Sequence, residues 1–401
     1  MLILNERQQK FVDLAVDWFY NSPSKLLQLA GYAGTGKSVV ISEILRRLNL
    51  PINDVLPMAY TGQACTIMRK NGLSNACTCH SGLFFVSKEI DTINGHTNID
   101  STFNVPLLKW KFLPKDFSAS SIKLIILDEA WMIPKRFKKY IDDTGIKVIA
   151  AGDPGQLPPV ADDPGYLVDG DIFFLTDLMR QSKDSSIIYL ANRARNGLPL
   201  EPGLYNNEAL VIYDDELDNE MISRSDIVLC GTNKTRDELN STIRNKILGI
   251  CTDYPMIGER IICRKNNWDR NVSDIPLVNG LIGTVVKQPN VSDFNGEIFS
   301  IDFLPDISQI PFIDLKVNYK YINSNHTNKE LLLKNPYICG EIFEYAYAST
   351  VHLSQGSEYS SGVIIEEFMN RNIQNALNYT AISRFKNKLV YVKHRPKTWM
   401  I

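Results

Sequence analysis

The sequence lacks the features that mark membrane, secreted and strongly basic proteins. No apolar run approaches the roughly 18 residues that a membrane-spanning helix needs, and the first segment, MLILNERQQK, soon turns polar and has no signal-peptide core. The seven cysteines are scattered and odd in number, which argues against a disulfide framework and for reduced thiols. The 43 basic and 45 acidic residues give a net charge of −2, which excludes a uniformly basic surface but not a local basic groove. We therefore expect a soluble, cytoplasmic protein without membrane contact.

The order of apolar segments predicts an α/β protein with more than one domain. A chain of 401 residues is long enough for two or three domains. Apolar positions at helical spacing predict a helix over 6–20, and residues 25–30, 123–130 and 147–153 are expected strands of a mostly parallel sheet. A second alternation of strands and helices begins near residue 226. Its expected elements are strands at 226–232, 361–368 and 388–392 and a helix at 234–248.

A phosphate-binding loop stands between the first strand and the next helix. Residues 31–38, GYAGTGKS, fit the pattern G-x-x-x-x-G-K-[ST], in which glycines let backbone N–H groups surround phosphate oxygens. Lys37 is expected to reach the β- and γ-phosphates, and Ser38 is expected to ligate Mg²⁺. The sequence therefore predicts an ATP site with Mg²⁺. The nucleotide contacts expected from this loop are Gly31, Gly34, Thr35, Gly36, Lys37 and Ser38.

Two later segments complete the expected hydrolysis site. The strand at 123–130 ends in Asp128 and Glu129, of which the first would ligate the metal and the second would orient the attacking water. A third strand leads into GDPGQLPP, whose Gln156 is a candidate for sensing the γ-phosphate. Acidic residues and Pro/Gly turns are also common as plain solvated turns, so the assignment depends on the three segments occurring together.

The whole set of motifs resembles that of superfamily 1 helicases. The motifs are GYAGTGKS, LDEAW, AGDPGQLPPV, STVHLSQGSEY and NYTAISR, in that order. The resemblance is strongest to the RecD/Dda branch, and to its phage members in particular, which implies a location in the cytoplasm of a bacterial host. It implies two RecA-like domains that hold ATP between them, with a small β insertion in the first domain and an SH3-like β subdomain in the second. The implied boundaries are 1–86 and 118–165 for the first domain, 87–117 for the insertion, 166–268 and 344–401 for the second domain, and 269–343 for the subdomain.

The resemblance also implies nucleotide contacts outside the phosphate loop. Gln8 would read the adenine, and Gly356 and Glu358 would link the ATP cleft to the nucleic-acid path. Arg180 and Arg384 would be arginine fingers supplied by the second domain. Charge that develops on the transferred phosphoryl group needs cations, and a finger from a second domain couples domain closure to hydrolysis.

The residues that the resemblance places along single-stranded DNA are short and polar. Hydroxyl and amide side chains hold phosphates without reading bases. The same residue types are ordinary cap and turn residues, and Asn233 is equally suited to cap the 234–248 helix. The implied contacts are Thr61, Gln63, Thr78, His80, Thr232, Asn233, Thr350 and His352.

The 87–117 insertion is expected to carry the residue that separates strands at a fork. A ring stacked on the last base pair would contribute roughly 1–3 kcal/mol, comparable to an average DNA stacking step. The insertion offers Phe103, Trp110, Phe112 and Phe117. Phe103 lies where a hairpin tip would fall and is our candidate, whereas a small local core is the alternative interpretation of these rings.

The sequence therefore predicts an ATP- and Mg²⁺-dependent helicase that moves on single-stranded DNA, 5′ to 3′ by resemblance, in replication, recombination or repair. Two alternatives remain open. One is a superfamily 1 RNA helicase, because backbone contacts do not reveal whether a 2′-hydroxyl is accommodated. The other is a P-loop ATPase switch that binds nucleic acid without unwinding it. We expect a monomer whose partners are single-stranded DNA, a fork duplex and a single-strand-binding or replication protein.

Overall fold

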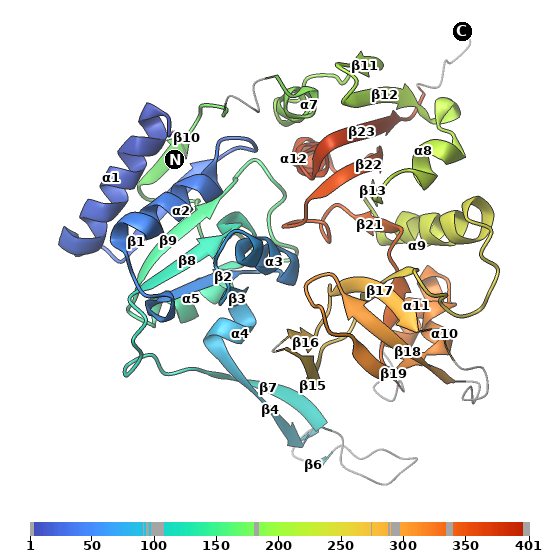
Figure 1. Cartoon of the computed structure of the whole chain (residues 1–401), viewed down its shortest axis with the longest axis horizontal. Coiled ribbons are helices and arrows are strands. Elements are labelled where there is room, and N and C mark those ends of the chain that lie inside the picture. The colour runs from blue at the N-terminus through green and yellow to red at the C-terminus, as the bar shows by residue number, and fades with distance from the viewer. Residues whose placement is uncertain are drawn as a thin grey trace.

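The chain folds into two α/β halves that face each other, with smaller β elements below them (Figure 1). The structure is a computed structural model, and it describes residues 4–90, 92–93, 96–97, 108–179, 184–273, 275–287, 289, 297–333 and 340–395. Each half contains a six-stranded sheet in which nearly all neighbouring strands are parallel. The expected fold class is confirmed. Within the described residues, no helix is both long enough and apolar enough to cross a bilayer.

The first sheet has the strand order β10-β1-β9-β8-β2-β3, and all of its pairs are parallel. Its strands are β1 (Leu26–Gly31), β2 (Val55–Ala59), β3 (Cys77–Thr78), β8 (Leu124–Asp128), β9 (Lys147–Gly152) and β10 (Ile172–Leu175). The apolar strand β10 pairs with the free edge of β1, so this sheet continues beyond residue 165. The expected boundary between the two domains at 165 and 166 was therefore placed too early.

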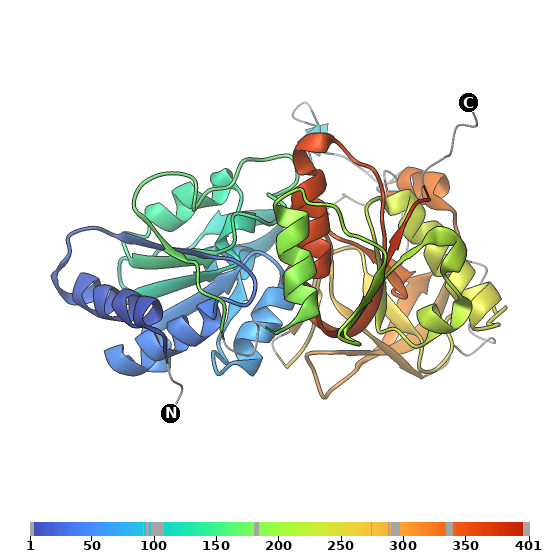
Figure 2. The same ribbon diagram turned by 90° about the horizontal axis from the view of Figure 1, so that it is seen from above.

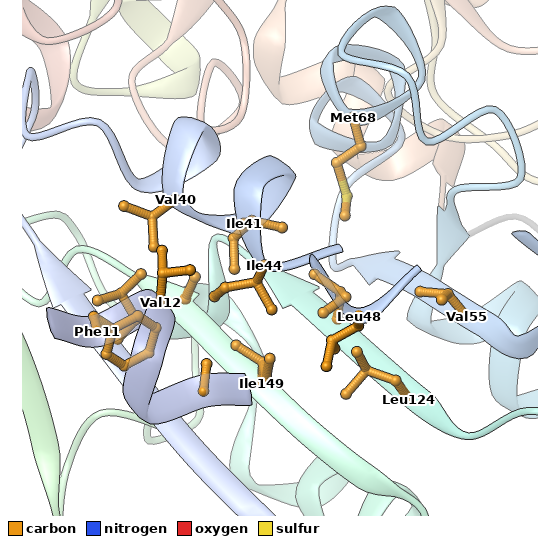
Figure 3. Packing of buried hydrophobic residues seen from close by; sticks show 14 of the residues in the cluster. Phe11, Val12, Val40, Ile41, Ile44, Leu48, Val55, Met68, Leu124 and Ile149 are labelled. Carbon is orange, nitrogen blue, oxygen red and sulfur yellow. The ribbon is translucent and has the colours of Figure 1, made fainter. Parts of the chain in front are cut away.

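Helices α1 and α2 cover one face of the first sheet and hold the phosphate loop in place. Phe11 and Val12 of α1 pack with Val40 and Ile44 of α2 and with Ile149 of β9 (Figure 3). Full burial of such a side chain contributes about 1.5–3 kcal/mol, so the start of α2 is firmly anchored. The helices of this half are α1 (Glu6–Asn21), α2 (Lys37–Leu48), α3 (Gly62–Lys70), α4 (Cys79–Leu83) and α5 (Lys135–Asp142), with short 3₁₀ turns η1 (Ile52–Asp54) and η2 (Ala130–Met132).

The expected β insertion is a hairpin that projects from the first domain. Strand β4 (Phe84–Ile90) pairs antiparallel with β7 (Leu108–Pro114), from Phe84 opposite Pro114 to Ile90 opposite Leu108. Between them, β5 (Thr92–Ile93) pairs with β6 (His96–Thr97). The hairpin begins at residue 84, earlier than the boundary expected at 87, because the apolar base of β4 packs on the first domain.

The second sheet has the order β11-β12-β23-β22-β13-β21 and is parallel except at its β11 edge. Its strands are β11 (Gly203–Tyr205), β12 (Ala209–Tyr213), β13 (Ile227–Cys230), β21 (Ala348–Thr350), β22 (Tyr359–Ile365) and β23 (Phe385–Lys393). Its helices are α7 (Ser186–Arg195), α8 (Asn219–Ser223), α9 (Asn233–Thr242) and α12 (Arg371–Ile382), with a 3₁₀ turn η3 (Asp214–Glu216) and a π-helical turn η4 (Ile243–Ile247). Helices α7 and α12 lie side by side between the two halves (Figure 2).

A β subdomain is inserted into the second domain. Its five-stranded antiparallel sheet has the order β19-β18-β17-β14-β20. The strands are β14 (Arg260–Cys263), β17 (Ile282–Lys287), β18 (Ile298–Pro305), β19 (Phe312–Asn318) and β20 (Phe343–Tyr345), with a separate hairpin of β15 (Asn267–Val272) and β16 (Ile275–Leu277) and helices α10 (Tyr319–Ile322) and α11 (His326–Leu333). The chain enters through β14 and leaves through its neighbour β20, so the subdomain extends beyond the expected limits of 269 and 343.

Candidate nucleotide and nucleic-acid sites

The phosphate loop follows β1 and ends in the first turn of α2. Gly36 has a φ of +82°, and a Cβ there would lie 2.6 Å from Gln8 Nε2, so this position requires glycine. Lys37 Nζ donates a hydrogen bond to the carbonyl of Gly31 at 2.7 Å. The ammonium group therefore lies within the loop at the N-terminus of α2, the position at which backbone N–H groups bind anions.

Gln8 supports the phosphate loop from α1. It is fully buried, its Nε2 donates to the carbonyl of Thr35 at 2.9 Å, and its Oε1 accepts from the backbone N–H of Asn5 at 2.9 Å. Both ends of the amide are thus bonded within the protein. The structure brings Gln8 to the nucleotide side of the first domain, as expected, and its contact with adenine remains a prediction.

Asp128 and Glu129 stand at the carboxyl end of β8. The backbone N–H of Glu129 donates to Asp128 Oδ1 at 2.9 Å, while burial and the neighbouring charge of Glu129 raise the pKa of the Asp128 carboxyl. Glu129 has a φ of +49°, in the left-handed region that non-glycine residues seldom adopt. Two adjacent carboxyls repel each other when both are ionised, and a cation beside them would favour the ionised forms.

The residues at this position fit a magnesium ion. Asp128 and Ser38 would hold it, since both supply the oxygen ligands that Mg²⁺ prefers. The bound ion would neutralise charge on the β- and γ-phosphates of the nucleotide. A cation beside Asp128 would favour the ionised form of its carboxyl, against the burial and the Glu129 charge that raise its pKa.

Arg384 reaches this site from the second domain. Its Nη1 lies 3.7 Å from Glu129 Oε1, and only 6% of its side chain is exposed. Its Nε donates to the carbonyl of Thr380 at 3.2 Å, and its Nη2 donates to the hydroxyl of Ser383 at 3.1 Å. These bonds orient the guanidinium toward the first domain. The structure therefore brings Arg384 to the expected place, whereas Arg180 lies outside the described residues.

Helix α12 supplies two further residues that contact the first domain and that sequence reasoning missed. The hydroxyl of Tyr379 accepts from the N–H of Ala33 in the phosphate loop at 2.7 Å and donates to the carboxyl of Asp153. Burial raises the pKa of Tyr379, so its proton stays on the hydroxyl. Thr380 Oγ1 accepts from the N–H of Leu157 at 2.9 Å. Their place in the NYTAISR motif beside Arg384 was the available signal.

Gln156 lies in the same cleft with an unused acceptor. The residue is buried, and its Oε1 finds no hydrogen-bond partner among the residues that the structure describes. Its backbone carbonyl accepts from Trp131 Nε1 at 3.0 Å, which fixes the loop. A buried polar atom without a partner is rare and unfavourable, so this side chain is placed to contact a polar ligand or water in the cleft.

A separate cavity of about 520 Å³ lies between the first domain and the β subdomain. Thr61 and Thr78 cap the N-termini of α3 and α4 at its wall. Burial lowers the pKa of both His80 and His352, and the charge of Arg136 adds to this effect at His80. Both imidazoles are therefore neutral near pH 7. Five of the expected DNA contacts line this cavity, namely Thr61, Gln63, Thr78, His80 and His352.

The other expected DNA contacts are engaged within the second domain. The N–H and hydroxyl of Thr232 both donate to the carboxylate of Glu367, at 2.9 and 3.2 Å. Asn233 Oδ1 accepts from Arg236 Nη1 at 3.0 Å, and buried Thr350 accepts from the N–H of Leu353 at 3.3 Å. The structure therefore does not bring these three residues to the cavity.

Gly356 and Glu358 lie between the two sites. Gly356 has a φ of +77°, and a Cβ there would lie 2.8 Å from Thr61 Oγ1, so the glycine packs closely against the start of α3. Glu358 forms an ion pair with Lys386 at 2.5 Å, and its charge contributes to the raised pKa of Asp128. Gly356 thus packs against Thr61, which lines the cavity, and Glu358 lies near the expected metal site.

The insertion hairpin contacts the subdomain through two rings. The Phe112 ring lies 6.2 Å from that of Trp268 in β15 and 5.8 Å from the imidazole of His80. The sequence did not assign this contact, because the two rings come from distant insertions. Phe117 packs partly buried against the first domain. Phe103 and the side chain of Trp110 lie outside the described residues, so the choice of Phe103 as the strand-separating residue remains a prediction.

Sequence comparisons find a family model and curated proteins that resemble parts of this chain. A family model described as an AAA domain matches residues 15–162. The uncharacterized protein R530 of Acanthamoeba polyphaga mimivirus is 26% identical over 175 residues, which are 40% of this chain and 34% of that protein. The ATP-dependent DNA helicase RRM3 of Saccharomyces cerevisiae is 24% identical over 324 residues, which are 71% of this chain and 42% of that protein. The chain thus spans less than half the length of these curated relatives.

Solved structures resemble the chain over its whole length. The Pif1 helicase from Candida albicans superposes with a TM-score of 0.55 at 19% identity, over 98% of this chain and 95% of that one. The Pif1 helicase from Bacteroides in complex with ADP-AlF3 and single-stranded DNA superposes with a TM-score of 0.54 at 18% identity, over 100% of this chain and 95% of that one. This chain therefore has the fold of these structures, with two RecA-like domains and added β subdomains. The expected placement in the RecD/Dda branch remains a prediction.

Proposed function

We propose that this chain is an ATP-dependent helicase of superfamily 1, similar to Pif1 helicases, that moves along single-stranded DNA and unwinds a fork. The observation that carries the proposal is the approach of Arg384 from the second domain to Glu129 of the first, at 3.7 Å. A cleft with a phosphate loop on one side and a guanidinium on the other suits phosphoryl transfer between two domains. The names of RRM3, a DNA helicase, and of Bacteroides Pif1 with ADP-AlF3 and single-stranded DNA support the same function.

In this proposal the first domain holds the triphosphate and the second domain completes the site. Lys37 neutralises charge on the β- and γ-phosphates, Glu129 orients the attacking water, and Arg384 stabilises the charge that develops during transfer. Because Arg384 comes from the second domain, hydrolysis is fast only when the domains are closed. Loss of the γ-phosphate then weakens the closed arrangement.

A chain of contacts joins this cleft to the cavity proposed to hold the strand. Gln355 Nε2 donates to the carbonyl of Leu157, next to Gln156, at 2.8 Å. The hydroxyl of Thr61 donates to the carbonyl of Gln355 at 3.4 Å. The same segment carries His352, which lines the cavity. Changes in the cleft are therefore transmitted to groups expected to hold the sugar-phosphate backbone.

Fork unwinding with defined tails tests the proposal. Duplexes with one 5′ or one 3′ tail, of DNA or of RNA, are incubated with ATP and Mg²⁺, and Lys37→Ala serves as the inactive control. Unwinding that requires a 5′ DNA tail supports the proposal, including the polarity taken from the sequence resemblance. Unwinding on RNA tails alone would indicate an RNA helicase, and strand-stimulated hydrolysis without unwinding would indicate a switch. Either result overturns the DNA helicase assignment.

Salt dependence gives a second test of backbone recognition. Affinity for single-stranded DNA is expected to fall as salt rises, with a log–log slope of about −0.7 for each phosphate neutralised. Oligonucleotides of different sequence should bind alike, because short polar side chains contact phosphates without reading bases. Strong preference for one sequence, insensitive to salt, would contradict the proposed strand site.

A further inference from the structure

A second arginine of the second domain reaches the phosphate loop. Arg195 is the last residue of α7, and its Cζ lies 3.4 Å from the centroid of the Tyr32 ring. Tyr32 is the second residue of GYAGTGKS. A guanidinium that lies flat on an aromatic face is held in a defined orientation, so the position of Arg195 depends on the loop.

The surroundings of Arg195 are those of the nucleotide cleft. A Cβ added to Gly155 would lie 3.2 Å from Arg195 Cδ and 3.1 Å from Tyr379 Cε1. The guanidinium carbon is 5.9 Å from the centroid of the Tyr379 ring, and Tyr379 itself bonds to Ala33 of the loop. Arg195 is therefore enclosed by the phosphate loop, the loop before Gln156 and helix α12.

One donor of this guanidinium is unused. Nη1 of Arg195 is buried, and across the described part of the chain it has no hydrogen-bond partner. A buried donor without an acceptor is unfavourable, and more so on a charged group. Phosphate oxygens are the acceptors that a planar, always charged guanidinium binds best.

We propose that Arg195 is a phosphate-binding residue of the nucleotide site, which contacts the terminal phosphate of bound ATP in addition to Arg384. The inference rests on the ATP-dependent function proposed above and adds one residue to it. Tyr32 holds the guanidinium in place on the loop, and Nη1 donates to a γ-phosphate oxygen. Arg195 therefore distinguishes ATP from ADP, and it links α7 to the occupancy of the loop.

The same helix provides a matched control. Arg193 stacks on Tyr189, with its Cζ 5.7 Å from the ring centroid, and its guanidinium donates to the carbonyl of Pro199. Arg193→Ala thus removes the same charge and the same kind of ring contact from α7, at a position that faces away from the cleft. Arg195→Lys keeps the charge and loses the planar stack.

The test compares a triphosphate with a diphosphate. Binding of Mg²⁺ with AMP-PNP and of Mg²⁺ with ADP is measured by calorimetry, with oligo-dT bound, for the wild type and the three variants. For Arg195→Ala we expect AMP-PNP affinity to fall about tenfold or more, as for other hydrogen bonds to charged groups. ADP affinity should stay within about twofold, Arg195→Lys should be intermediate, and Arg193→Ala should match the wild type.

Each outcome separates the inference from the function on which it rests. If Arg195→Ala weakens AMP-PNP and ADP equally, Arg195 only positions the loop, and the inference is wrong. Unchanged binding of both nucleotides also overturns it. If Arg195→Ala does not fold, as judged by circular dichroism, the ratio of AMP-PNP affinity to ADP affinity is measured for Arg195→Lys instead. A ratio equal to that of the wild type then overturns the inference. A wild-type protein that binds neither nucleotide would instead overturn the proposed function.

Discussion

Arg384 and Glu129 come from different domains and face each other across the cleft, with Nη1 3.7 Å from Oε1. The carboxylate is the group expected to orient water, and the guanidinium is the group expected to stabilise the transferred phosphoryl. This distance is longer than that of a tight ion pair. A terminal phosphate oxygen would bind the guanidinium more strongly than a carboxylate at this distance does. In the proposed mechanism, this pair marks the position at which closure of the two domains completes the site.

Arg384→Ala should separate binding from catalysis. We expect nucleotide affinity to be nearly unchanged, because the phosphate loop is intact, and single-turnover hydrolysis to fall by about 10³-fold or more. Lys388→Ala, which removes an exposed cation from the strand that follows Arg384, is the control. Loss of affinity with an unchanged rate per bound ATP would show that Arg384 is a binding residue.

Lys37→Ala should abolish hydrolysis without unfolding the protein. The mutation removes the cation that the loop holds beside the β- and γ-phosphates, while the core of α1 and α2 stays intact. Steady-state ATP hydrolysis with single-stranded DNA measures the loss, and circular dichroism measures the fold. Lys10→Ala, an exposed change on α1, is the control. Near-normal turnover in folded Lys37→Ala protein would rule out this loop as the ATPase site.

Tyr379→Phe should loosen the contact between the domains. The hydroxyl of Tyr379 is bonded to both Ala33 and Asp153, and its removal leaves a partly buried N–H and a buried carboxyl without this partner. Such a loss amounts to about 1–3 kcal/mol, so the thermal midpoint should fall by a few degrees. Tyr20→Phe, which is well exposed, should leave the midpoint unchanged. An unaltered midpoint in Tyr379→Phe would show that the bridge contributes little to the closed arrangement.

Thr61→Ala and Thr232→Ala form a matched pair. Each removes an N-cap hydroxyl, so each should lower stability by about 0.5–2 kcal/mol. Only Thr61 lines the cavity, while Thr232 is bonded to Glu367. We therefore expect Thr61→Ala alone to weaken binding of single-stranded DNA, as measured by fluorescence anisotropy. An equal loss of affinity in both variants would mean that the strand also contacts the start of α9.

The nucleotide side of the molecule was largely predictable from sequence, because its parts are local motifs. The loop at 31–38 and the carboxylates after β8 are fixed by a few neighbouring residues and by the strand before them. The strands predicted to within a few residues are β1, β8, β9, β13, β22 and β23, since buried parallel strands are continuous apolar runs. Strands β2, β3 and β10 of the first sheet were not predicted, and with β10 the end of that sheet was missed.

The contacts between distant segments were not predictable in the same way. Tyr379 and Asp153 are 226 positions apart, and no local pattern shows that a tyrosine hydroxyl will face a given carboxyl. Thr61 and Thr232 are both N-cap threonines, and the resemblance to helicases assigned both of them to contact with single-stranded DNA. The two threonines differ because Glu367, in the segment after β22, places its carboxylate at the N-terminus of α9, where it accepts hydrogen bonds from Thr232 and Thr235.

The left-handed backbone of Glu129 has a consequence for how this chain can change over evolutionary time. A non-glycine residue at a φ of +49° stores unfavourable backbone energy, of order 1 kcal/mol. Selection for thermal stability alone would favour glycine or asparagine at this position. In the proposed mechanism the carboxylate of Glu129 orients the attacking water, so a lineage that stopped hydrolysing nucleotide would be expected to lose this glutamate early. On that proposal, the residue at position 129 would indicate whether a related sequence still encodes an active enzyme.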